Sequence, residues 1–503
     1  MKLATCDLIK QIDNFSEQSG IASKQVLMQK AGQAVANAVR SAIPQGSRVL
    51  IIAGKGNNGG DGYSAAIELC PDFSVSVFAP FGAEQKNAEG RHFLSLAREA
   101  SIKIYSLESY DIAKSYIASA DCIVDALFGV GFSGDIPEAL LPIAKSINSS
   151  SAKIIAVDLP LGILSDSGEV LPNAIRAHQT VALSYLKPAH VSYPAKEYMG
   201  KVTLDTLGLD GVTYPDDIKF SYFLIDRAFV KENLPQRKET ANKGSFGKAL
   251  LIVGSDKYRG AAHLSMEAAL RSGVGYVGFF GDVELSRELR MKFPEAIYEK
   301  KSKSLSEISS KYSAVLIGSG SGVSGELADI ISELLDSEGA PIIIDADGIN
   351  AIAKFNLQAK LKASPREIVL TPHPLEFSRI SGIPVEDINA KRIEAAEGFA
   401  REYGVTVLLK GAATVVTNGI STYINSSGSQ ALAKAGSGDV LSGIIVAMIA
   451  SGLSSDIACA LSAYIHGAAG DSLAEEYSSL GVTPSDLPKY IARILAGIEK
   501  EIL

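Results

Sequence analysis

The sequence predicts an α/β protein of two domains, each built around a mostly parallel sheet, and three observations support this prediction. The chain has 503 residues, which is too long for one ordinary hydrophobic core. Short apolar runs recur along both halves and are separated by helical stretches, a spacing typical of βαβ units. A glycine-rich turn opens a helix in each half, and such a turn lets the backbone approach an anionic ligand.

Composition is that of an ordinary globular protein. It is 47% hydrophobic and 21% charged, and the net charge of −8 argues against nucleic acid, because phosphate contacts need clustered Lys and Arg. The longest apolar run, near Ile444 to Ala450, is too short to cross a bilayer, and the N-terminus has no signal segment. The four cysteines, Cys6, Cys70, Cys122 and Cys459, form no CxxC pair, which indicates buried thiols in a reducing compartment. We expect a cytoplasmic protein that binds neither nucleic acid nor membrane.

The first half follows the βαβ pattern element by element. An amphipathic helix is predicted over Ser23–Ala42, and the apolar run Arg48–Ala53 predicts a strand. The glycine-rich turn Gly54–Gly62 follows this strand, and a helical segment runs from Tyr63 to Leu69. Further strands are predicted over 74–79, 122–128, 154–157, 180–186 and 201–207.

The pattern weakens over residues 208–233, where two acidic, proline-containing patches occur. We therefore expect a domain boundary within residues 210–225. One domain is predicted over 1–213 and the other over 220–503.

A second α/β pattern begins after Lys243. It includes a hairpin over Val415–Asn425 that turns at Asn418-Gly419, and a long helix from Asp439 to about Ala450. The glycine-rich turns of the two halves differ in sequence, so no internal repeat is predicted. Further strands are predicted over 249–253, 276–280, 314–317, 341–345, 368–371 and 405–409.

Polar side chains gather at the strand ends of the first half. The glycine-rich turn carries Asn57, Asn58 and Asp61, while Asp125 and Asp158 each end a later strand. A tight structural turn explains the glycines alone, and either strand-end Asp alone is explained as a cap of the next turn. Ligands of open α/β sheets bind outside the carboxyl ends of the strands, so Asn58, Asp125 and Asp158 together favour a binding site.

These segments resemble the NAD(P)H-hydrate epimerase family, also called the YjeF N-terminal family, over roughly residues 8–210. The resemblance implies a Rossmann-like α/β/α domain in which Asp158 is the catalytic acid/base. It also implies a potassium ion (K+) held by Asn58, Asp125 and Leu161, where the family usually has Ser. Leu161 offers only its backbone carbonyl, a ligand that K+ accepts. The residues implied to contact the hydrated nucleotide are Asn57, Asn58, Gly59, Gly60, Asp61, Gly129, Val130, Gly131, Phe132, Ser133, Gly134, Asp135 and Asp158.

The turn 436–439 of the second half precedes an apolar helix. Its glycines and the free N–H groups of the first helical turn suit an anion, and Asp439 is placed to act as a base on a hydroxyl. An Asp that caps a core helix explains the same residues. Other strand ends favour a site, because Lys410 follows one strand, His373 follows another and the carboxylates of segment 345–347 follow a third.

Together these segments resemble the ADP- or ATP-dependent NAD(P)H-hydrate dehydratase family, of the ribokinase-like superfamily, over roughly residues 225–500. The specific matches include TPHP-x-E around His373, KG-x-x-T from Lys410, and GSGD ending at Asp439. The resemblance implies that Asp439 is the catalytic base and that Mg2+ assists the transfer. The residues implied to bind the adenine nucleotide are Lys410, Gly411, Ala412, Ala413, Thr414 and Gly438. Those implied to contact the hydrate are Ala261, Gly320, His373 and Asp439.

The two resemblances imply a bifunctional enzyme, expected to be a homo-oligomer, that repairs hydrated NADH and NADPH. The first domain would interconvert the R and S epimers, and the second would dehydrate the S epimer. The fusion order favours ADP over ATP as co-substrate, giving AMP and phosphate.

Two other functions fit part of the sequence. One is a ribokinase-like vitamin kinase, of the hydroxymethylpyrimidine or thiazole type, fused to a non-catalytic binding module. The other is a non-enzymatic scaffold of the kind found in RNA-decapping factors. The TPHP-x-E and KG-x-x-T segments favour the dehydratase over the kinase. The retained Asn58, Asp125 and Asp158, with the acidic net charge, favour an active first domain over a scaffold.

Overall fold

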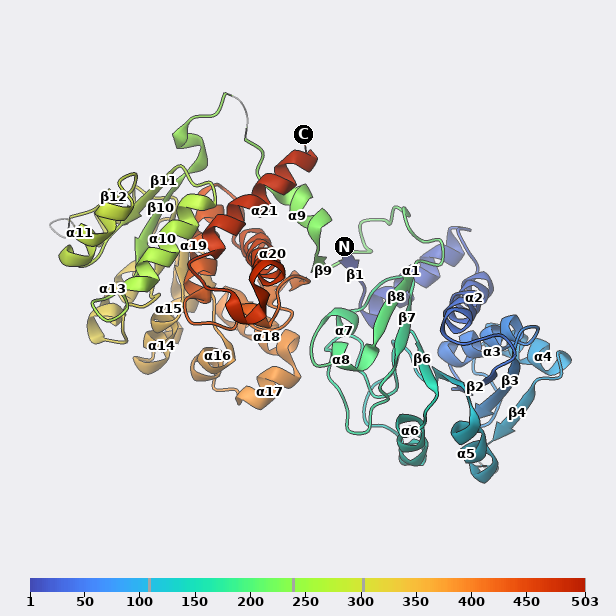
Figure 1. The fold of residues 1–503 in the computed structure, drawn as a ribbon. Coiled ribbons are helices and arrows are strands. Elements are labelled where there is room, and N and C mark those ends of the chain that lie inside the picture. Colours follow the sequence, from blue (N-terminus) through green and yellow to red (C-terminus); the bar gives the residue numbers. More distant parts are fainter. Residues whose placement is uncertain (107–109, 238–239, 301–303, 503) are drawn as a thin grey trace. The chain divides into compact units, whose positions relative to one another are not determined.

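The computed structural model confirms the α/β class, and the chain divides into two compact units (Figure 1). One unit is Lys2–Tyr222, which we call the N-terminal unit. The other is Phe223–Leu503 together with Met1, which we call the C-terminal unit. Within the part of the chain that the structure describes, no helix has the length and apolar character needed to span a bilayer. The described residues are 1–106, 110–237, 240–300 and 304–502.

The N-terminal unit is built on a single parallel sheet. Its strands are β2 (Arg48–Ala53), β3 (Ser74–Ala79), β4 (Lys103–Ser106), β5 (Cys122–Ala126), β6 (Lys153–Val157), β7 (Gln179–Leu183) and β8 (Lys201–Asp205). They lie in the order β4-β3-β2-β5-β6-β7-β8, and every neighbouring pair is parallel. The mostly parallel sheet expected from the sequence is thus confirmed.

Helices cover both faces of this sheet. They are α1 (Cys6–Gln18), after a short strand β1 (Lys2–Leu3), α2 (Lys24–Ala42), α3 (Asn57–Leu69), α4 (Ala88–Glu99), α5 (Tyr110–Ser119), α6 (Leu141–Asn148), α7 (Pro188–Val191) and α8 (Lys196–Met199). Val49 and Ile51 of β2 pack in a core with α1 to α4, whereas Leu50 and Ile52 pack in a core with α5 and α6. Because alternate residues of a strand face opposite sides, this apolar run produces a three-layer α/β/α unit.

The start of α3 differs from the sequence prediction. The predicted helix began at Tyr63, but α3 begins at Asn57, so the glycine-rich turn is itself the first part of the helix. The glycines permit this close packing, since a Cβ on Gly59 would lie 1.9 Å from the carbonyl oxygen of Gly54. The helix N-terminus therefore begins directly beyond β2.

The C-terminal unit is built on a larger, mostly parallel sheet. Its strands are β9 (Tyr222–Ile225), β10 (Lys248–Ile252), β11 (Tyr276–Phe279), β12 (Ile297–Tyr298), β13 (Ala314–Ile317), β14 (Ile342–Ile344), β15 (Ile368–Leu370), β16 (Thr406–Leu409), β17 (Val415–Thr417) and β18 (Thr422–Asn425). They follow the order β9-β18-β17-β16-β15-β14-β13-β10-β11-β12. The predicted hairpin is confirmed, because β17 and β18 pair antiparallel and the Asn418 N–H donates to Ser421 O at 3.3 Å.

Among the helices of the C-terminal unit, the apolar helix α19 (Ser437–Ala450) is buried in the hydrophobic core. The others are α9 (Arg227–Asn233), α10 (Arg259–Arg271), α11 (Val283–Lys292), α12 (Leu305–Ser309), α13 (Gly325–Asp336), α14 (Asp347–Lys354), α15 (Gln358–Ala363), α16 (Pro374–Ser381), α17 (Val385–Ala390), α18 (Arg392–Tyr403), α20 (Ser455–Gly481) and α21 (Leu487–Ile502). α19 starts two residues before the predicted Asp439 and packs against α10 and α20. Its all-round apolar surface is therefore explained by burial.

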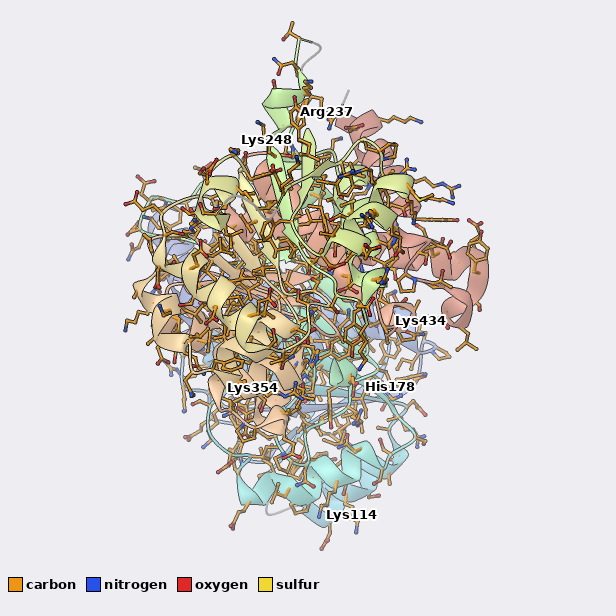
Figure 2. All side chains as sticks on the ribbon, turned by 90° about the vertical axis from the view of Figure 1, so that its left-hand side faces the viewer. Lys114, His178, Arg237, Lys248, Lys354 and Lys434 are labelled. Carbon is orange, nitrogen blue, oxygen red and sulfur yellow. The ribbon has the colours of Figure 1, made fainter. Side chains whose placement is uncertain are left out.

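Most charged side chains lie on the surface of their own unit. Figure 2 shows Lys114 of α5 and Lys354 of α14 as such side chains, and both residues are exposed. Charged groups that are buried are rare in proteins unless they are paired or functional. Asp158, Lys187 and Asp345 are buried, and all three lie just beyond the carboxyl end of a strand.

Candidate active sites

Segments that follow six neighbouring strands of the N-terminal unit, β3, β2, β5, β6, β7 and β8, line one cavity of about 930 Å³. This is large enough for a nucleotide-sized ligand. Apolar runs predicted as strands over 122–128 and 180–186 end early, at Ala126 and Leu183, and Leu127 and Phe128 line the cavity instead. The predicted site residues that line it are Asn57, Asn58, Asp61, Gly129, Val130, Gly131, Phe132 and Asp158.

The other predicted ligand contacts lie outside this lining. Gly59 and Gly60 are buried within α3. Loop 133–135, which contains Ser133, Gly134 and Asp135, is exposed. The structure therefore brings Asn57, Asn58 and Asp61 of the first predicted loop and residues 129–132 of the second into the cavity lining.

Asp158 forms a buried ion pair in the cavity wall. Its Oδ1 accepts hydrogen bonds from Lys187 Nζ at 2.5 Å and from the Leu183 N–H at 3.2 Å. The Lys187 N–H donates to His190 Nδ1 at 2.9 Å, so His190 Nε2 carries the proton and donates to Asp158 O at 2.6 Å. Burial lowers the pKa of His190 to about 4, which keeps this imidazole neutral. His190 is thus hydrogen-bonded to the backbone of both Asp158 and Lys187, which holds the two residues of the ion pair in place.

Two further carboxyls from α1 and α3 face the same cavity. Burial, with the nearby charges of Asp158 and Asp13, raises the pKa of Asp61 well above its usual range. Burial also raises the pKa of Asp13 to about 6. The cavity therefore holds two carboxyls whose pKa values are raised, Asp61 and Asp13, beside the ion pair of Asp158 and Lys187.

The predicted K+ ligands provide oxygen atoms in a buried setting. Asp125 is fully buried, and its oxygens accept the Leu127 N–H at 3.2 Å and the Leu161 N–H at 2.8 Å. Burial raises the pKa of this carboxyl to about 6, since the charged form is disfavoured away from water. A Cβ at Gly129 would lie 3.1 Å from Asn58 Oδ1, so the amide oxygen faces this glycine. Carboxylate and amide oxygens such as these suit a monovalent cation as ligands.

In the C-terminal unit four adjacent parallel strands each contribute one residue to a polar cluster. Asp345 accepts the Ser319 hydroxyl on Oδ2 at 2.9 Å. It accepts the Thr371 hydroxyl at 2.7 Å and the Lys410 ammonium at 2.9 Å on Oδ1. These residues follow β13, β14, β15 and β16, which are neighbours in the sheet. The carboxyl ends of these strands therefore form one site.

The charges of this cluster stabilise each other. Burial alone would raise the pKa of Asp345, but the Lys410 ammonium and the two hydroxyls outweigh burial, and the net effect is a lowered pKa. Burial alone would lower the pKa of Lys410, but the charges of Asp345 and Glu376 outweigh burial, and the net effect is a raised pKa. Both groups are charged at neutral pH.

Asp439 meets this cluster from the first turn of α19. Burial, followed by repulsion from Asp345, raises the pKa of Asp439 to about 7. A Cβ at Gly438 would lie 3.4 Å from Lys410 Nζ, which brings the helix N-terminus to the ammonium. A carboxyl with such a pKa can both accept and return a proton near neutral pH.

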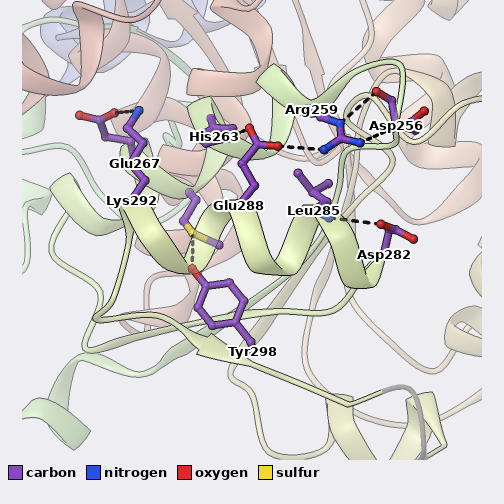
Figure 3. A network of polar contacts seen from close by, with 10 residues as sticks. Asp256, Arg259, His263, Glu267, Asp282, Leu285, Glu288, Lys292 and Tyr298 are labelled. Carbon is purple, nitrogen blue, oxygen red and sulfur yellow. Dashed lines mark hydrogen bonds and ion pairs between the residues drawn. The ribbon is translucent and has the colours of Figure 1, made fainter.

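Gly320 and Ala261 lie against each other beside the cluster. Gly320 has a φ of +63°, and a Cβ there would lie 2.5 Å from the Cβ of Ala261. The start of α10, which carries Ala261, is tied to α11 by an ion pair of Glu288 with Arg259 at 3.0 Å and a hydrogen bond of Glu288 with His263 at 2.9 Å (Figure 3). The network fixes the turn of helix that faces Gly320.

His373 begins α16 and is partly exposed. Its Nδ1 accepts the N–H groups of Leu375 at 3.2 Å and Glu376 at 3.3 Å. Burial and the charge of Lys410 lower its pKa. His373 therefore has a structural role, since its side chain caps α16, and its Nε2 lies 3.2 Å from Glu376 Oε1.

The predicted nucleotide loop 410–414 runs from the buried cluster to the surface. Gly411 and Ala412 are exposed, whereas Ala413 and Thr414 are half-buried. Arg392 of α18 donates to Leu409 O at 3.1 Å and Lys410 O at 3.0 Å, which holds the start of the loop.

Comparison with known proteins matches each unit to a family. Residues 249–493 match the NAD(P)H-hydrate dehydratase family, and residues 24–189 match the YjeF-related protein N-terminus. A bifunctional NAD(P)H-hydrate repair enzyme of Thermofilum pendens is 32% identical, covering 100% of this chain and 97% of its own length. The chain belongs to the family of bifunctional NAD(P)H-hydrate repair enzymes. The member from Escherichia coli is 33% identical over 93% of this chain and 89% of its own length.

Solved structures match this repair-enzyme chain over its C-terminal part. An ADP/ATP-dependent NAD(P)H-hydrate dehydratase from Bacillus subtilis, co-crystallised with ATP/Mg2+, is 29% identical with a TM-score of 0.50. The match covers 99% of the Bacillus subtilis chain and 55% of this chain. A ribokinase-like superfamily protein of Enterococcus faecalis, 24% identical with a TM-score of 0.51, shares the fold. The ribokinase-like class expected from the sequence is confirmed.

Several residues of the two clusters were not singled out as site residues from the sequence. They are Lys187, His190, Asp13, Ser319 and Thr371. Lys187 carried a usable signal, because it follows the predicted strand 180–186 as Asp158 follows its own. Asp13 carried none, since α1 is amphipathic and its polar positions look like a solvated face.

Proposed function

We propose that this chain repairs hydrated NADH and NADPH, with the N-terminal unit interconverting the R and S epimers and the C-terminal unit dehydrating the S epimer with ADP. The observation that carries this proposal is the position of Asp439, whose pKa is raised by burial to about 7, beside the Lys410–Asp345 pair at the start of α19. A base, an ammonium and a helix N-terminus together suit phosphoryl transfer to a hydroxyl.

The proposed dehydration has two steps. Asp439 takes the proton of the C6 hydroxyl, whose oxygen attacks the terminal phosphorus of ADP, and AMP leaves. Lys410 and the N–H groups at Gly438 stabilise the charge on the transferring group. The lone pair of the ring nitrogen then expels phosphate, and loss of a C5 proton gives NADH. Phosphorylation is needed because hydroxide is a poor leaving group at neutral pH.

We assign the ligand contacts of the dehydratase from the sequence segments and their placement. Loop 410–414 and Gly438 would hold the adenine nucleotide, because they join the Lys410 ammonium to the N-terminus of α19. Ala261, Gly320 and His373 would contact the hydrate. Among the described residues no group of three or more His, Cys, Asp or Glu side chains is placed to hold a metal ion. Mg2+ would therefore enter with the nucleotide phosphates that it coordinates.

The N-terminal cavity would bind the same hydrate, with Asp158 as the acid/base. The cavity lining contains most residues of the predicted contact set, and Asp158 lies in its wall with a lysine partner. A K+ ion would be held by Asp125, by Asn58 Oδ1 and by the carbonyl of Leu161, where it would neutralise the buried carboxylate. The homo-oligomeric state and the cytoplasmic location stay predictions.

The test supplies separated R and S hydrates to the full chain and measures NADH formation by its absorbance. With ADP, the S hydrate should give NADH at once, and the R hydrate should give NADH after a lag set by epimerisation. AMP and inorganic phosphate should appear in equal amounts with NADH. Accumulation of a phosphorylated product without NADH would instead identify a kinase and reject the proposal.

A further inference from the structure

Lys187 is a buried cation in the wall of the N-terminal cavity. It follows β7 and precedes α7, and its side chain is 1% exposed. Its ammonium donates to Asp158 Oδ1 at 2.5 Å and to Leu183 O at 2.7 Å. An ammonium has three N–H donors, so these two contacts within the described part of the chain leave one for a molecule in the cavity.

Stability alone does not explain this arrangement. The loss of hydration of two buried charges offsets most of their attraction, so a buried pair is weak evidence for stabilisation. Asp158 also has a φ of +63°, a left-handed conformation that is costly for a residue with a side chain. Strain and buried charge at one residue, on the wall of a cavity, are features of functional sites.

We propose that Lys187 is a second catalytic residue of the epimerase, the acid that protonates the ring nitrogen while Asp158 removes the hydroxyl proton. This inference rests on the proposed function of the N-terminal unit. In the hydrated nicotinamide ring, C6 carries both a hydroxyl and the ring nitrogen N1. It is therefore a hemiaminal carbon, and its configuration is lost when the C6–N1 bond opens.

The ring-opening step balances within the pair. Asp158 takes the proton of the C6 hydroxyl, the oxygen electron pair forms a C6 carbonyl, and the C6–N1 electrons move to N1. Lys187 gives a proton to N1. A proton then passes from the Asp158 carboxyl to the Lys187 amine across their direct contact, which restores the ion pair. Rotation about C5–C6 and reversal of these steps close the ring on the other face.

The contact between the two side chains matches the substrate. The hydroxyl oxygen and N1 are bonded to the same carbon, so the base and the acid that serve them must lie next to each other. Lys187 Nζ and Asp158 Oδ1 are 2.5 Å apart and share the cavity wall. The neutral imidazole of His190, hydrogen-bonded to the backbone of both residues, holds them in register.

The test compares Lys187→Met and Lys187→Arg with Lys145→Met, an exposed lysine of α6, in the full chain. Lys187→Met should lower the kcat of epimerisation about 100-fold and leave KM nearly unchanged, because the acid is lost. Lys187→Arg should stay as slow, since a guanidinium can pair with Asp158 but does not release a proton near neutral pH. S-hydrate dehydration by the same molecules reports that the C-terminal unit is intact, and a denaturant unfolding curve like that of Lys145→Met reports that the N-terminal unit is folded.

The outcomes distinguish Lys187 as a proton donor from Lys187 as a residue that only orients Asp158. Wild-type kcat in Lys187→Arg would overturn the acid role and leave Lys187 as a partner that only orients Asp158. Wild-type epimerisation that is equally fast in D2O and H2O would also overturn it, because ring opening moves two protons, and this measurement needs no variant. Absence of epimerisation in the wild-type chain would reject the proposed function instead.

Discussion

The two sites of this chain both lie beyond the carboxyl ends of parallel strands, and each contains a Lys–Asp ion pair, but the surroundings of the two pairs differ. In the N-terminal unit the Lys187–Asp158 pair itself lines the cavity. In the C-terminal unit the Lys410–Asp345 pair is completed by two hydroxyls, and a third charged group, Asp439, meets it from a helix N-terminus. In the proposed mechanisms, the pair on the cavity wall exchanges protons with the substrate, whereas the pair with a nearby base and helix N-terminus assists phosphoryl transfer.

The largest effect expected is that of Asp439→Asn on the dehydratase. Loss of the base should slow NADH formation from the S hydrate by about 10⁴-fold. Binding of ADP, followed by calorimetry, should change little, because Asn keeps the size of the side chain. The control is Asp329→Asn on the exposed face of α13, which should be neutral. Dehydration at near the wild-type rate would remove Asp439 from the mechanism.

Asp158→Asn should affect only the other site. We expect conversion of the R hydrate to slow by about 10³-fold, down to spontaneous epimerisation, because an amide does not take the hydroxyl proton. Dehydration of the S hydrate should continue at the wild-type rate. The measurement is the NADH progress curve from each pure epimer. Unchanged repair of both epimers would separate Asp158 from epimerisation.

Lys410→Met should destabilise the C-terminal unit, since it leaves the Asp345 carboxylate buried without its cation. Breaking such a pair costs about 3 kcal/mol of unfolding free energy. Asp345→Asn combined with Lys410→Met should recover most of this loss, because no buried charge remains. Denaturant unfolding of the two variants measures both values. A double variant no more stable than Lys410→Met would show that the ammonium stabilises the fold in another way.

The pH dependence should also distinguish the sites. In the proposed mechanism Asp439 acts as the carboxylate, and burial raises its pKa to about 7. The kcat/KM of S-hydrate dehydration should therefore fall about tenfold per pH unit below 7 and level off above it, because this parameter reports the groups of the free enzyme. Rates measured from pH 6 to pH 9 give the profile. A flat profile through this range would argue against Asp439 as the base.

Removal of K+ is expected to have the smallest effect, and only on the N-terminal site. Replacing K+ by a larger organic cation should slow epimerisation a few-fold, since the buried Asp125 carboxylate loses its counter-ion. S-hydrate dehydration should be unaffected. Adding K+ back should restore the rate. Equal epimerisation rates with and without K+ would contradict the proposed K+ site.

Sequence patterns predicted the main strands well where both faces are buried. The segment 314–317 matches β13 at both ends, because a strand covered on both faces is a continuous apolar run. Strands β4, β9 and β12 were not predicted. β4 and β12 are short, partly exposed strands at sheet edges, and they lack such a run. The predicted start of α3, at Tyr63, lies six residues after the observed start at Asn57. Glycine has a low helix propensity, so the glycine-rich turn was not predicted as helix, although close packing requires glycine there.

The sites were predictable where one rule applied. Asp158, Asp345 and Lys410 each follow a strand, and strand ends of a parallel sheet converge. What the sequence could not give was the pairing between them. The contact of Asp158 with Lys187, 29 residues along the chain, depends on the sharp backbone turn at Asp158, which no residue pattern announces.

Mixing two single-site variants tests the central claim most directly. The Asp158→Asn and Asp439→Asn proteins are each supplied with R hydrate and ADP, separately and then together. Two independent sites that act in sequence predict slow NADH formation by either protein alone and wild-type rates in the mixture, because the S hydrate diffuses from one protein to the other. A mixture that stays slow, or either variant alone reaching the wild-type rate, would contradict the account.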